Sequence, residues 1–185
     1  MKPFISLIVT AILGVHDAKA ADVVVPLPHE IVIEGSMSFE KLQPTIDKLQ
    51  AGTENDIFYI SINSPGGEAD TGFALAHAMR SNKSREVCEI KGMAASAAAV
   101  TLLGCDSIIT DADDVVMFHT PYYLIDDEPV RTAKLNGEYL PRFITLRFDI
   151  LTGDEWFKFV QGGDVYISGD VFKVRFNNWK QAVGF

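Results

Sequence analysis

Ser96 lies at the centre of the run GMAASAAAV (residues 92–100), in which almost every side chain is small. A serine hydroxyl attacks a carbonyl only when a neighbouring base takes its proton, and small neighbours leave the hydroxyl accessible. Gly92 permits a tight turn after a strand, and a helix predicted to begin near Ala94 would bring free backbone N–H groups to the same place. Taken alone, however, the run fits a small serine in close helix packing better than a nucleophile.

Four histidines could act as the base for such a serine, and three have ordinary interpretations. His16 lies in the apolar N-terminal segment, His29 precedes the first predicted strand, and His77 lies between two alanines of a predicted helix. His119 instead ends the run VVMFH and is followed by Thr120-Pro121, where proline prevents the strand from continuing inside the sheet. Because ligands bind at the carboxyl ends of strands in α/β sheets, His119 is the best candidate for a general base.

The sequence Ser64-Pro65-Gly66-Gly67 follows a predicted strand and is interpreted as a turn. Residues without Cβ let a backbone approach a ligand closely and offer it N–H groups. On its own this stretch is a plain loop between a strand and a helix. Together with the Ser96 turn, at the equivalent end of the neighbouring βα unit, it provides two converging backbone corners, which an oxyanion hole requires.

Short β-rich runs alternate with helical patterns, which predicts an α/β fold of repeated βα units around a mostly parallel sheet, in a single domain. The predicted strands cover residues 30–35, 57–62, 86–90, 107–110, 115–119 and 164–168. The predicted helices cover residues 38–50, 69–81, about 94–104, 130–151 and 154–161. Ser38 is expected to cap the first helix, and Pro44 is tolerable there only in the opening turn. The aromatic residues near the C-terminus are expected to cover a core or a subunit neighbour; they are Phe172, Phe176, Trp179 and Phe185.

The first 20 residues resemble a secretory signal. Lys2 gives a basic start, Phe4 to Val15 is apolar but too short to span a bilayer, and Ala18-Lys19-Ala20 is a small-x-small cleavage site. We therefore expect cleavage after Ala20, a mature domain of residues 21–185 and an exported protein, either periplasmic or secreted. An uncleaved anchor or an apolar first strand are the alternatives.

The chain is acidic, with a formal net charge of −9 at pH 7. Removal of residues 1–20 takes away Lys2, Lys19 and Asp17, so the charge becomes −10. An acidic surface without basic runs repels phosphate backbones, so nucleic acid is not expected as a partner. No further apolar stretch is long enough to span a membrane, so the mature chain is expected to have no membrane span.

Cys88 and Cys105 are the only two cysteines, and no histidine stands in metal-ligand spacing, so no metal is indicated. In an oxidising compartment the two could form a disulfide. Two buried free thiols are an equal alternative, because the sequence does not give their separation.

Four motifs in chain order, INSPGGEADTG, GMAASAA, VVMFHTP and DVYIS, resemble the proteolytic subunit of the Clp protease, a family of serine peptidases. The similarity runs from about Glu30 to Ser168 and implies the ClpP/crotonase-like fold. It implies Ser96 as the nucleophile, His119 as the base and Asp164, the first residue of DVYIS, as the acid of a catalytic triad. It further implies that the backbone N–H groups of Gly67 and Ala97 form the oxyanion hole, and that no cofactor is required. Gly162-Gly163 departs from the family, which usually has charged residues before this acid.

The resemblance and the expected export together predict an ATP-independent endopeptidase that cleaves peptides or unfolded protein segments. An ATPase partner is not expected, since ATP-driven unfolding belongs to the cytoplasm. The apolar segment 130–151, where the family has its inter-ring handle, favours a homo-oligomer. Three alternatives stay open: a Ser-Lys enzyme of the signal-peptide-peptidase type, an acyl-thioester-binding protein of the crotonase-like fold, and a catalytically inactive binding or scaffold protein.

Overall fold

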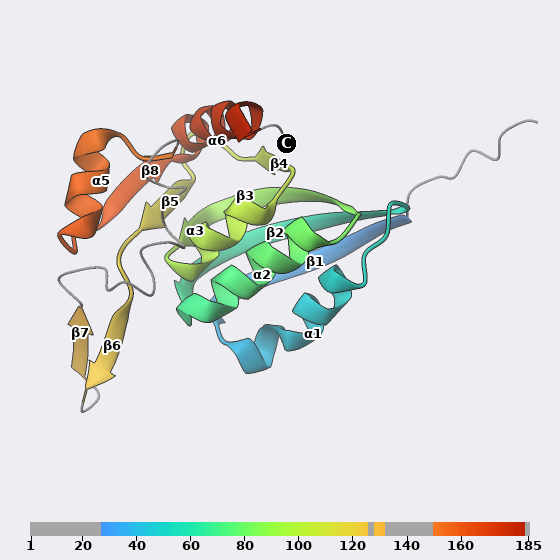
Figure 1. Ribbon diagram of the computed structural model, residues 1–185, viewed down its shortest axis with the longest axis horizontal. Coiled ribbons are helices and arrows are strands. Elements are labelled where there is room, and N and C mark those ends of the chain that lie inside the picture. The colour runs from blue at the N-terminus through green and yellow to red at the C-terminus, as the bar shows by residue number, and fades with distance from the viewer. Residues whose placement is uncertain (1–26, 126–127, 132–149, 184–185) are drawn as a thin grey trace, which may run out of the picture.

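A computed structural model of the chain describes residues 27–125, 128–131 and 150–183 (Figure 1). The predicted signal segment and all but the ends of the predicted 130–151 helix lie outside the described residues, as does Phe185. Within the described ranges, no helix combines the length and the apolar character needed to cross a membrane. Nor does any group of three or more His, Cys, Asp and Glu side chains in these ranges come together as a metal site.

The sheet is α/β in character and mostly parallel, as the alternation of strand and helix patterns predicts. Six strands form it in the order β1-β2-β3-β5-β8, with β4 also paired to β3. All pairs among β1 to β5 are parallel, whereas β8 pairs with β5 in the antiparallel direction. Their bounds are β1 Leu27–Met37, β2 Asp56–Gly67, β3 Arg85–Ala95, β4 Ser107–Ile109, β5 Val115–Phe118 and β8 Val165–Ser168.

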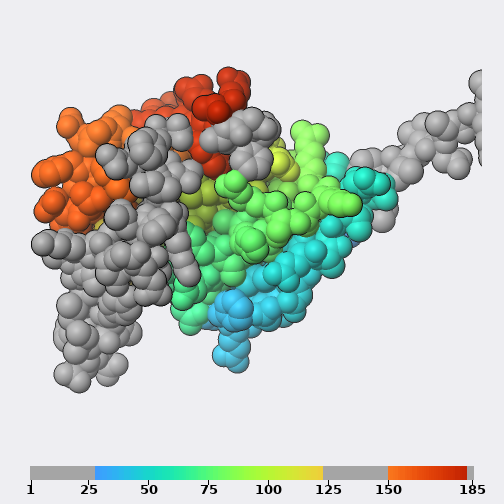
Figure 2. All heavy atoms as spheres, in the orientation of Figure 1, coloured from blue at the N-terminus to red at the C-terminus, as the bar shows by residue number. Residues whose placement is uncertain are grey.

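Helices α1 (Phe39–Gln50), α2 (Ala69–Ser81) and α3 (Ala97–Thr101) lie together on one face of β1 to β3 (Figure 1). Figure 2 shows this face with all atoms, where α1 and α2 cover much of the sheet. Alternate residues of each strand are buried beneath these helices, as the period of two in a strand requires. They include Ile31, Ile33, Ile60, Ile62, Cys88 and Ile90. On the opposite face, by contrast, Val32 and Tyr59 remain 67% and 46% exposed.

Helix α1 confirms Ser38 as its N-cap, because the hydroxyl accepts a hydrogen bond from the backbone N–H of Lys41 at 3.3 Å. Pro44, however, lies inside the helix and not in its opening turn, so that part of the prediction is wrong. Proline removes a backbone donor from a helix interior. The helix nevertheless continues and buries an apolar stripe formed by Leu42, Ile46 and Leu49, whose packing offsets the lost hydrogen bond.

Strands β2 and β3 extend further than predicted. The end of β2 includes the glycine-rich corner, and the end of β3 includes the alanines before Ser96. The Ser64–Gly67 segment is not a free turn but the irregular end of β2, in which Gly66 pairs with Ser36 and Ser64 pairs with Ala94. Strand β3 runs to Ala95, so the following helix begins at Ala97 and not near Ala94. Helix α3 has five residues and leads into a 3-10 turn over Leu102–Gly104.

The C-terminal part adds elements that flank the sheet. Strands β6 (Tyr122–Ile125) and β7 (Glu128–Arg131) form an antiparallel pair, so residues 130 and 131 are not helical as predicted. Helix α5 (Gly153–Val160) agrees with the prediction, and Thr152 and Glu155 form a capping box at its start. Helix α6 (Gly169–Val183), which lacked a sequence prediction, buries three of the C-terminal aromatic residues, namely Phe172, Phe176 and Trp179.

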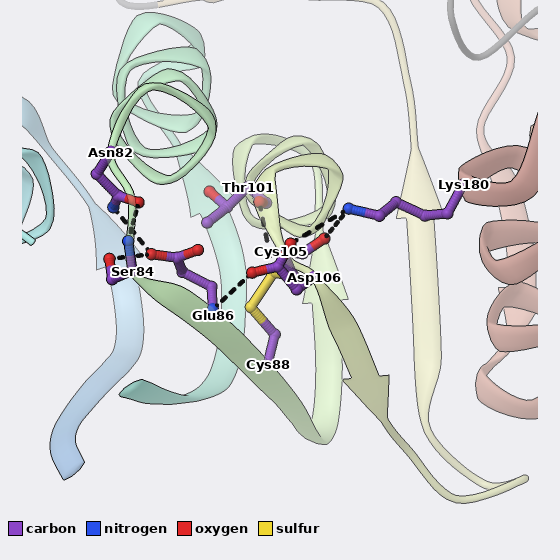
Figure 3. Close-up of polar contacts among 8 residues, drawn as sticks. All are labelled: Asn82, Ser84, Glu86, Cys88, Thr101, Cys105, Asp106 and Lys180. Carbon is purple, nitrogen blue, oxygen red and sulfur yellow. Dashed lines mark hydrogen bonds and ion pairs between the residues drawn. A yellow bond between two sulfur atoms is a disulfide. The ribbon is translucent and has the colours of Figure 1, made fainter. Parts of the chain in front are cut away.

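A disulfide joins Cys88 in β3 to Cys105, with 6.0 Å between their Cα atoms (Figure 3). It lies beside the carboxyl of Glu86, which is buried and accepts hydrogen bonds from Asn82 and Ser84. Burial raises the pKa of this carboxyl above its ordinary value, and the two hydrogen bonds only partly oppose that effect. The disulfide closes a covalent loop that contains Ser96, so it fixes both ends of that segment.

Replacement of both cysteines with alanine is expected to lower the free energy of unfolding by about 3 kcal/mol, the usual effect of a disulfide across a loop of about 15 residues. The bridged residues here are 17 positions apart. Urea unfolding with and without a thiol reductant measures the effect. Reductant should shift the wild-type midpoint and leave that of the double variant unchanged. Equal midpoints for the oxidised wild type and the double variant would contradict this expectation.

Candidate active site

Ser96 is the single residue between the end of β3 and the start of α3. Its backbone has φ 56° and ψ −121°, and it is the only residue other than glycine with positive φ in the described ranges. Such a conformation costs roughly 1–3 kcal/mol and persists only where the surroundings enforce it. Here the Ser96 N–H donates to the carbonyl of Met117 in β5 at 2.7 Å. The side chain makes no capping bond to the described part of α3, so the hydroxyl is available at a sharp strand-to-helix turn.

The end of β2 lies directly against this turn. A Cβ atom placed on Gly66 would come within 2.5 Å of the Ala95 carbonyl oxygen, 2.7 Å of the Ser96 Cβ and 2.9 Å of the Ala97 nitrogen. Ser64 holds the segment in place, since its hydroxyl donates to the Gly35 carbonyl at 2.6 Å and accepts from the Gly66 N–H at 3.0 Å. The two backbone corners therefore converge, as their positions in the sequence predict.

Gly66→Ala is expected to lower the free energy of unfolding by about 2–5 kcal/mol, because it adds steric overlap to the cost of a left-handed backbone. Gly66 has φ +92° and no room for a Cβ. Gly162→Ala is the matched control, since Gly162 has φ +83° but nothing within 4 Å of its added Cβ. Chemical denaturation should show the control losing only about 1–2 kcal/mol. An equal loss in both variants would show that close contact at Gly66 is unimportant.

His119 follows the last residue of β5, with its ring half-buried. Its Nδ1 lies 2.6 Å from the carbonyl oxygen of Thr120. A carbonyl oxygen only accepts hydrogen bonds, so Nδ1 carries the proton. In the neutral form of the ring the lone pair is then on Nε2, the tautomer that a general base requires. The ring stacks on Tyr122, with centroids 5.6 Å apart and planes inclined by 17°.

Asp164 immediately precedes β8 and is placed by the register of that strand. Phe118 pairs with Val165 at the end of the antiparallel β5–β8 ladder, and His119 and Asp164 are the residues that adjoin this last pair. Yet the hydrogen bond described for Nδ1 of His119 goes to Thr120. Asp164 and His119 therefore each follow or precede a residue of the same strand pair, but Asp164 does not form part of the cavity described next.

A cavity of about 270 Å³ brings four of the five predicted site residues together. Ser96, His119, Gly67 and Ala97 all contribute to its wall. Among the other members of that wall, the sequence did not single out the two with polar side chains, Glu68 and Tyr122. Glu68 directly follows the two glycines, and Tyr122 follows Thr120-Pro121, but neither residue type by itself indicates a place in a cavity.

Asp114 is another residue whose role the sequence did not reveal. Its place near the end of an element favours a turn or cap residue on a solvated surface, whereas its side chain is buried. The carboxylate accepts hydrogen bonds from the N–H groups of Gly92 and Asp111 and from the Thr110 hydroxyl. Burial tends to raise its pKa, but these hydrogen bonds outweigh burial and hold the pKa below its ordinary value. Asp114 thereby fixes Gly92 on the strand that leads to Ser96.

The fold and the position of this site together define a class, the ClpP-fold proteins. The structure matches a point mutant of ClpP1 from Listeria monocytogenes with a TM-score of 0.59 and 18% sequence identity over 79% of this chain and 86% of that one. It also matches a point mutant of a membrane-bound stomatin-specific protease, 1510-N, with a TM-score of 0.56 and 14% identity over 79% of this chain and 74% of that one. At these identities the likeness concerns the fold.

A match to the Clp protease family covers residues 28–128, which is more than half of the chain. The chain therefore belongs to the Clp protease family, and the resemblance noted in its motifs is confirmed. The matched region contains Ser96 and His119 but ends before Asp164. A search of curated proteins found no match.

Proposed function

We propose that the chain is a serine endopeptidase in which Ser96 is the nucleophile, His119 the base and Asp164 the acid. The observation that carries the proposal is the cavity lined by both Ser96, on its strained turn, and His119. The two backbone corners, represented by Gly67 and Ala97, line the same cavity. Membership of a protease family supports a peptidase in general, and this cavity is the reason to assign the serine mechanism.

Proton transfer requires the side chains of Ser96 and His119 to come together. Nε2 of His119 takes the Ser96 proton as the oxygen attacks the scissile carbonyl, and later returns it to the leaving amine. The proton on Nδ1 must be held throughout, so that the ring stays in this tautomer. Asp164 would accept a hydrogen bond from this Nδ1–H and stabilise the imidazolium, after a small ring rotation away from the Thr120 carbonyl.

Negative charge develops on the carbonyl oxygen during the attack. We assign its stabilisation to the backbone N–H groups of Gly67 and Ala97, which belong to the two corners around Ser96. Such donors act through fixed dipoles that need no reorganisation, and loss of one donor typically costs about 2.7–4 kcal/mol. The small residues around Ser96 keep side chains out of this position.

The substrate class and the location follow from the earlier sequence arguments. We propose that peptides and unfolded segments are cleaved without ATP, outside the cytoplasm, either in the periplasm or after secretion. The disulfide between Cys88 and Cys105 supports this location, because disulfides persist in oxidising compartments.

We further propose that the protein acts as a homo-oligomer. Parallel sheets are normally covered on both faces. Here the face that carries Val32, Tyr59 and Ile109 has large apolar side chains 67%, 46% and 47% exposed. A second copy of the chain would remove this surface from water. The number of copies is a matter for sedimentation or light scattering.

A Ser-Lys mechanism is the alternative that a pair of substitutions can decide. No lysine belongs to the described part of the cavity wall, and Lys134 is the lysine outside the described residues that follows the predicted signal segment. His119→Gln should remove hydrolysis if the histidine is the base, and Lys134→Met should not. The opposite pattern would support the Ser-Lys enzyme.

Hydrolysis of short fluorogenic peptides by the purified chain, with no nucleotide and no second protein, tests the proposed function directly. The proposal predicts turnover that ATP does not change. Absence of turnover for a broad peptide library would favour the binding or scaffold alternative.

A further inference from the structure

We infer that Glu68 makes the cavity beside Ser96 selective for peptides with lysine or arginine on the amino side of the scissile bond. This inference rests on the proposed peptidase function. The side chain at that position is attached to the carbon next to the attacked carbonyl, so it must lie beside the Ser96 hydroxyl.

The wall of the cavity has the composition that a long cationic side chain requires. Much of it is apolar, with Ala69, Val100 and Phe118 among its members. Lysine and arginine place their methylene chains along such surfaces while the charged end reaches a polar partner. Glu68 is the one acidic residue among the described residues of this wall, and no lysine or arginine belongs to that part of it.

The carboxylate of Glu68 is fixed without being neutralised. Its Oε2 accepts the N–H of Phe39, at the start of α1, at 2.6 Å and the hydroxyl of Thr71, in the first turn of α2, at 3.2 Å. Both partners are uncharged. Within the described residues no hydrogen bond is recorded for Oε1 and no ion pair for Glu68, so an incoming cation has an acceptor. Charge-assisted hydrogen bonds of this kind are about twice as strong as neutral ones.

The charge of the whole chain favours the same substrates. The formal net charge of −9 attracts cationic peptides and raises their local concentration near the surface. This long-range effect does not distinguish one site from another. The experiment must therefore separate the charge at position 68 from the charge of the whole surface.

Two fluorogenic peptides that differ only in lysine or norleucine before the scissile amide provide that comparison. Norleucine keeps the four-carbon chain of lysine and lacks its ammonium group. The wild-type enzyme should show a kcat/KM about tenfold or more higher for the lysine peptide, the range expected for one hydrogen bond to a charged group. Salt at about 1 M should reduce this ratio, because the pair lies partly in water.

Glu68→Gln should bring the ratio of the two kcat/KM values close to one. Glutamine can still accept the Phe39 N–H, so the start of α1 is retained, and thermal unfolding checks this. Glu40→Gln is the matched control, because it removes the same charge from the exposed first turn of α1 without belonging to the cavity wall, and it should preserve the ratio.

A wild-type ratio near one, or an unchanged ratio in Glu68→Gln, would overturn the inference while leaving the peptidase in place. The wild-type comparison stands even if the variant fails to fold. If neither peptide is cleaved and a fluorophosphonate does not label the protein, the proposed function fails and the inference fails with it.

Discussion

Replacement of Ser96 with alanine is expected to lower kcat for peptide hydrolysis by a factor on the order of 10⁶, the loss seen when a hydrolase serine is removed from a triad. The alanine variant keeps the fold, because one oxygen atom is removed from a side chain that makes no capping bond to the described part of α3. Initial rates of fluorogenic peptide cleavage measure the loss, and circular dichroism confirms the fold.

Ser81→Ala is the control for this result. Ser81 is the exposed last residue of α2 and lies outside the described wall of the cavity. Its replacement should leave kcat within about twofold, as expected for a substitution far from the chemistry. Substantial hydrolysis by Ser96→Ala would assign the nucleophile to another residue.

Asp164→Asn is expected to lower kcat by about 10⁴, since an amide in this position stabilises the wrong tautomer of the neighbouring imidazole. Asp164 and His119 adjoin the last pair of the β5–β8 ladder, Phe118 and Val165, but Nδ1 of His119 is hydrogen-bonded to the Thr120 carbonyl. The substitution therefore asks whether the carboxylate or the backbone carbonyl positions the base during turnover.

The matched control is Asp154→Asn, which changes an exposed acid in the first turn of α5. It should have little effect on kcat, although it removes a favourable charge near the helix N-terminus worth about 0.3–1 kcal/mol. Near-normal kcat in Asp164→Asn would show that Thr120 alone orients the ring, and the third member of the proposed triad would be lost.

Local patterns were sufficient to predict much of the fold. The apolar spacing in residues 69–81 predicts α2 with its observed bounds, because its periodic face packs directly on the sheet. The prediction for residues 154–161 is close for a similar reason, since Thr152 and Glu155 give a strong local start signal. The alternation of these helices with β-rich runs then allows few arrangements other than a mostly parallel sheet.

Pairing between distant strands explains where the predictions were wrong. Ser64-Pro65-Gly66-Gly67 has the composition of a turn, but β1 and β3 pair with it on either side and keep it extended. The alanines before Ser96 favour a helix by propensity, whereas pairing of Ala94 and Ala95 with β5 keeps them in the strand. As a result, the change of direction between β3 and α3 occurs entirely at Ser96. No local sequence pattern could predict the strained backbone at this residue.

The candidate site likewise contains residues that local sequence motifs predict and residues that only the folded arrangement shows. Motif positions led to Ser96, His119, Gly67 and Ala97, and all four belong to one cavity wall. Glu68 and Tyr122 were missed because a wall depends on the directions of side chains from separate elements. The disulfide could not be chosen over free thiols either, because the 6.0 Å between the Cα atoms of Cys88 and Cys105 exists only in the folded chain.

The central claim is that the hydroxyl of Ser96 is made nucleophilic by its surroundings. Treatment of the folded wild-type protein with a fluorophosphonate, followed by intact mass measurement and peptide mapping, tests it most directly. The account predicts one adduct per chain, carried by Ser96 and absent from the unfolded protein, whose hydroxyls lack an adjacent base. An unlabelled folded protein, or an adduct on a different residue, would contradict it.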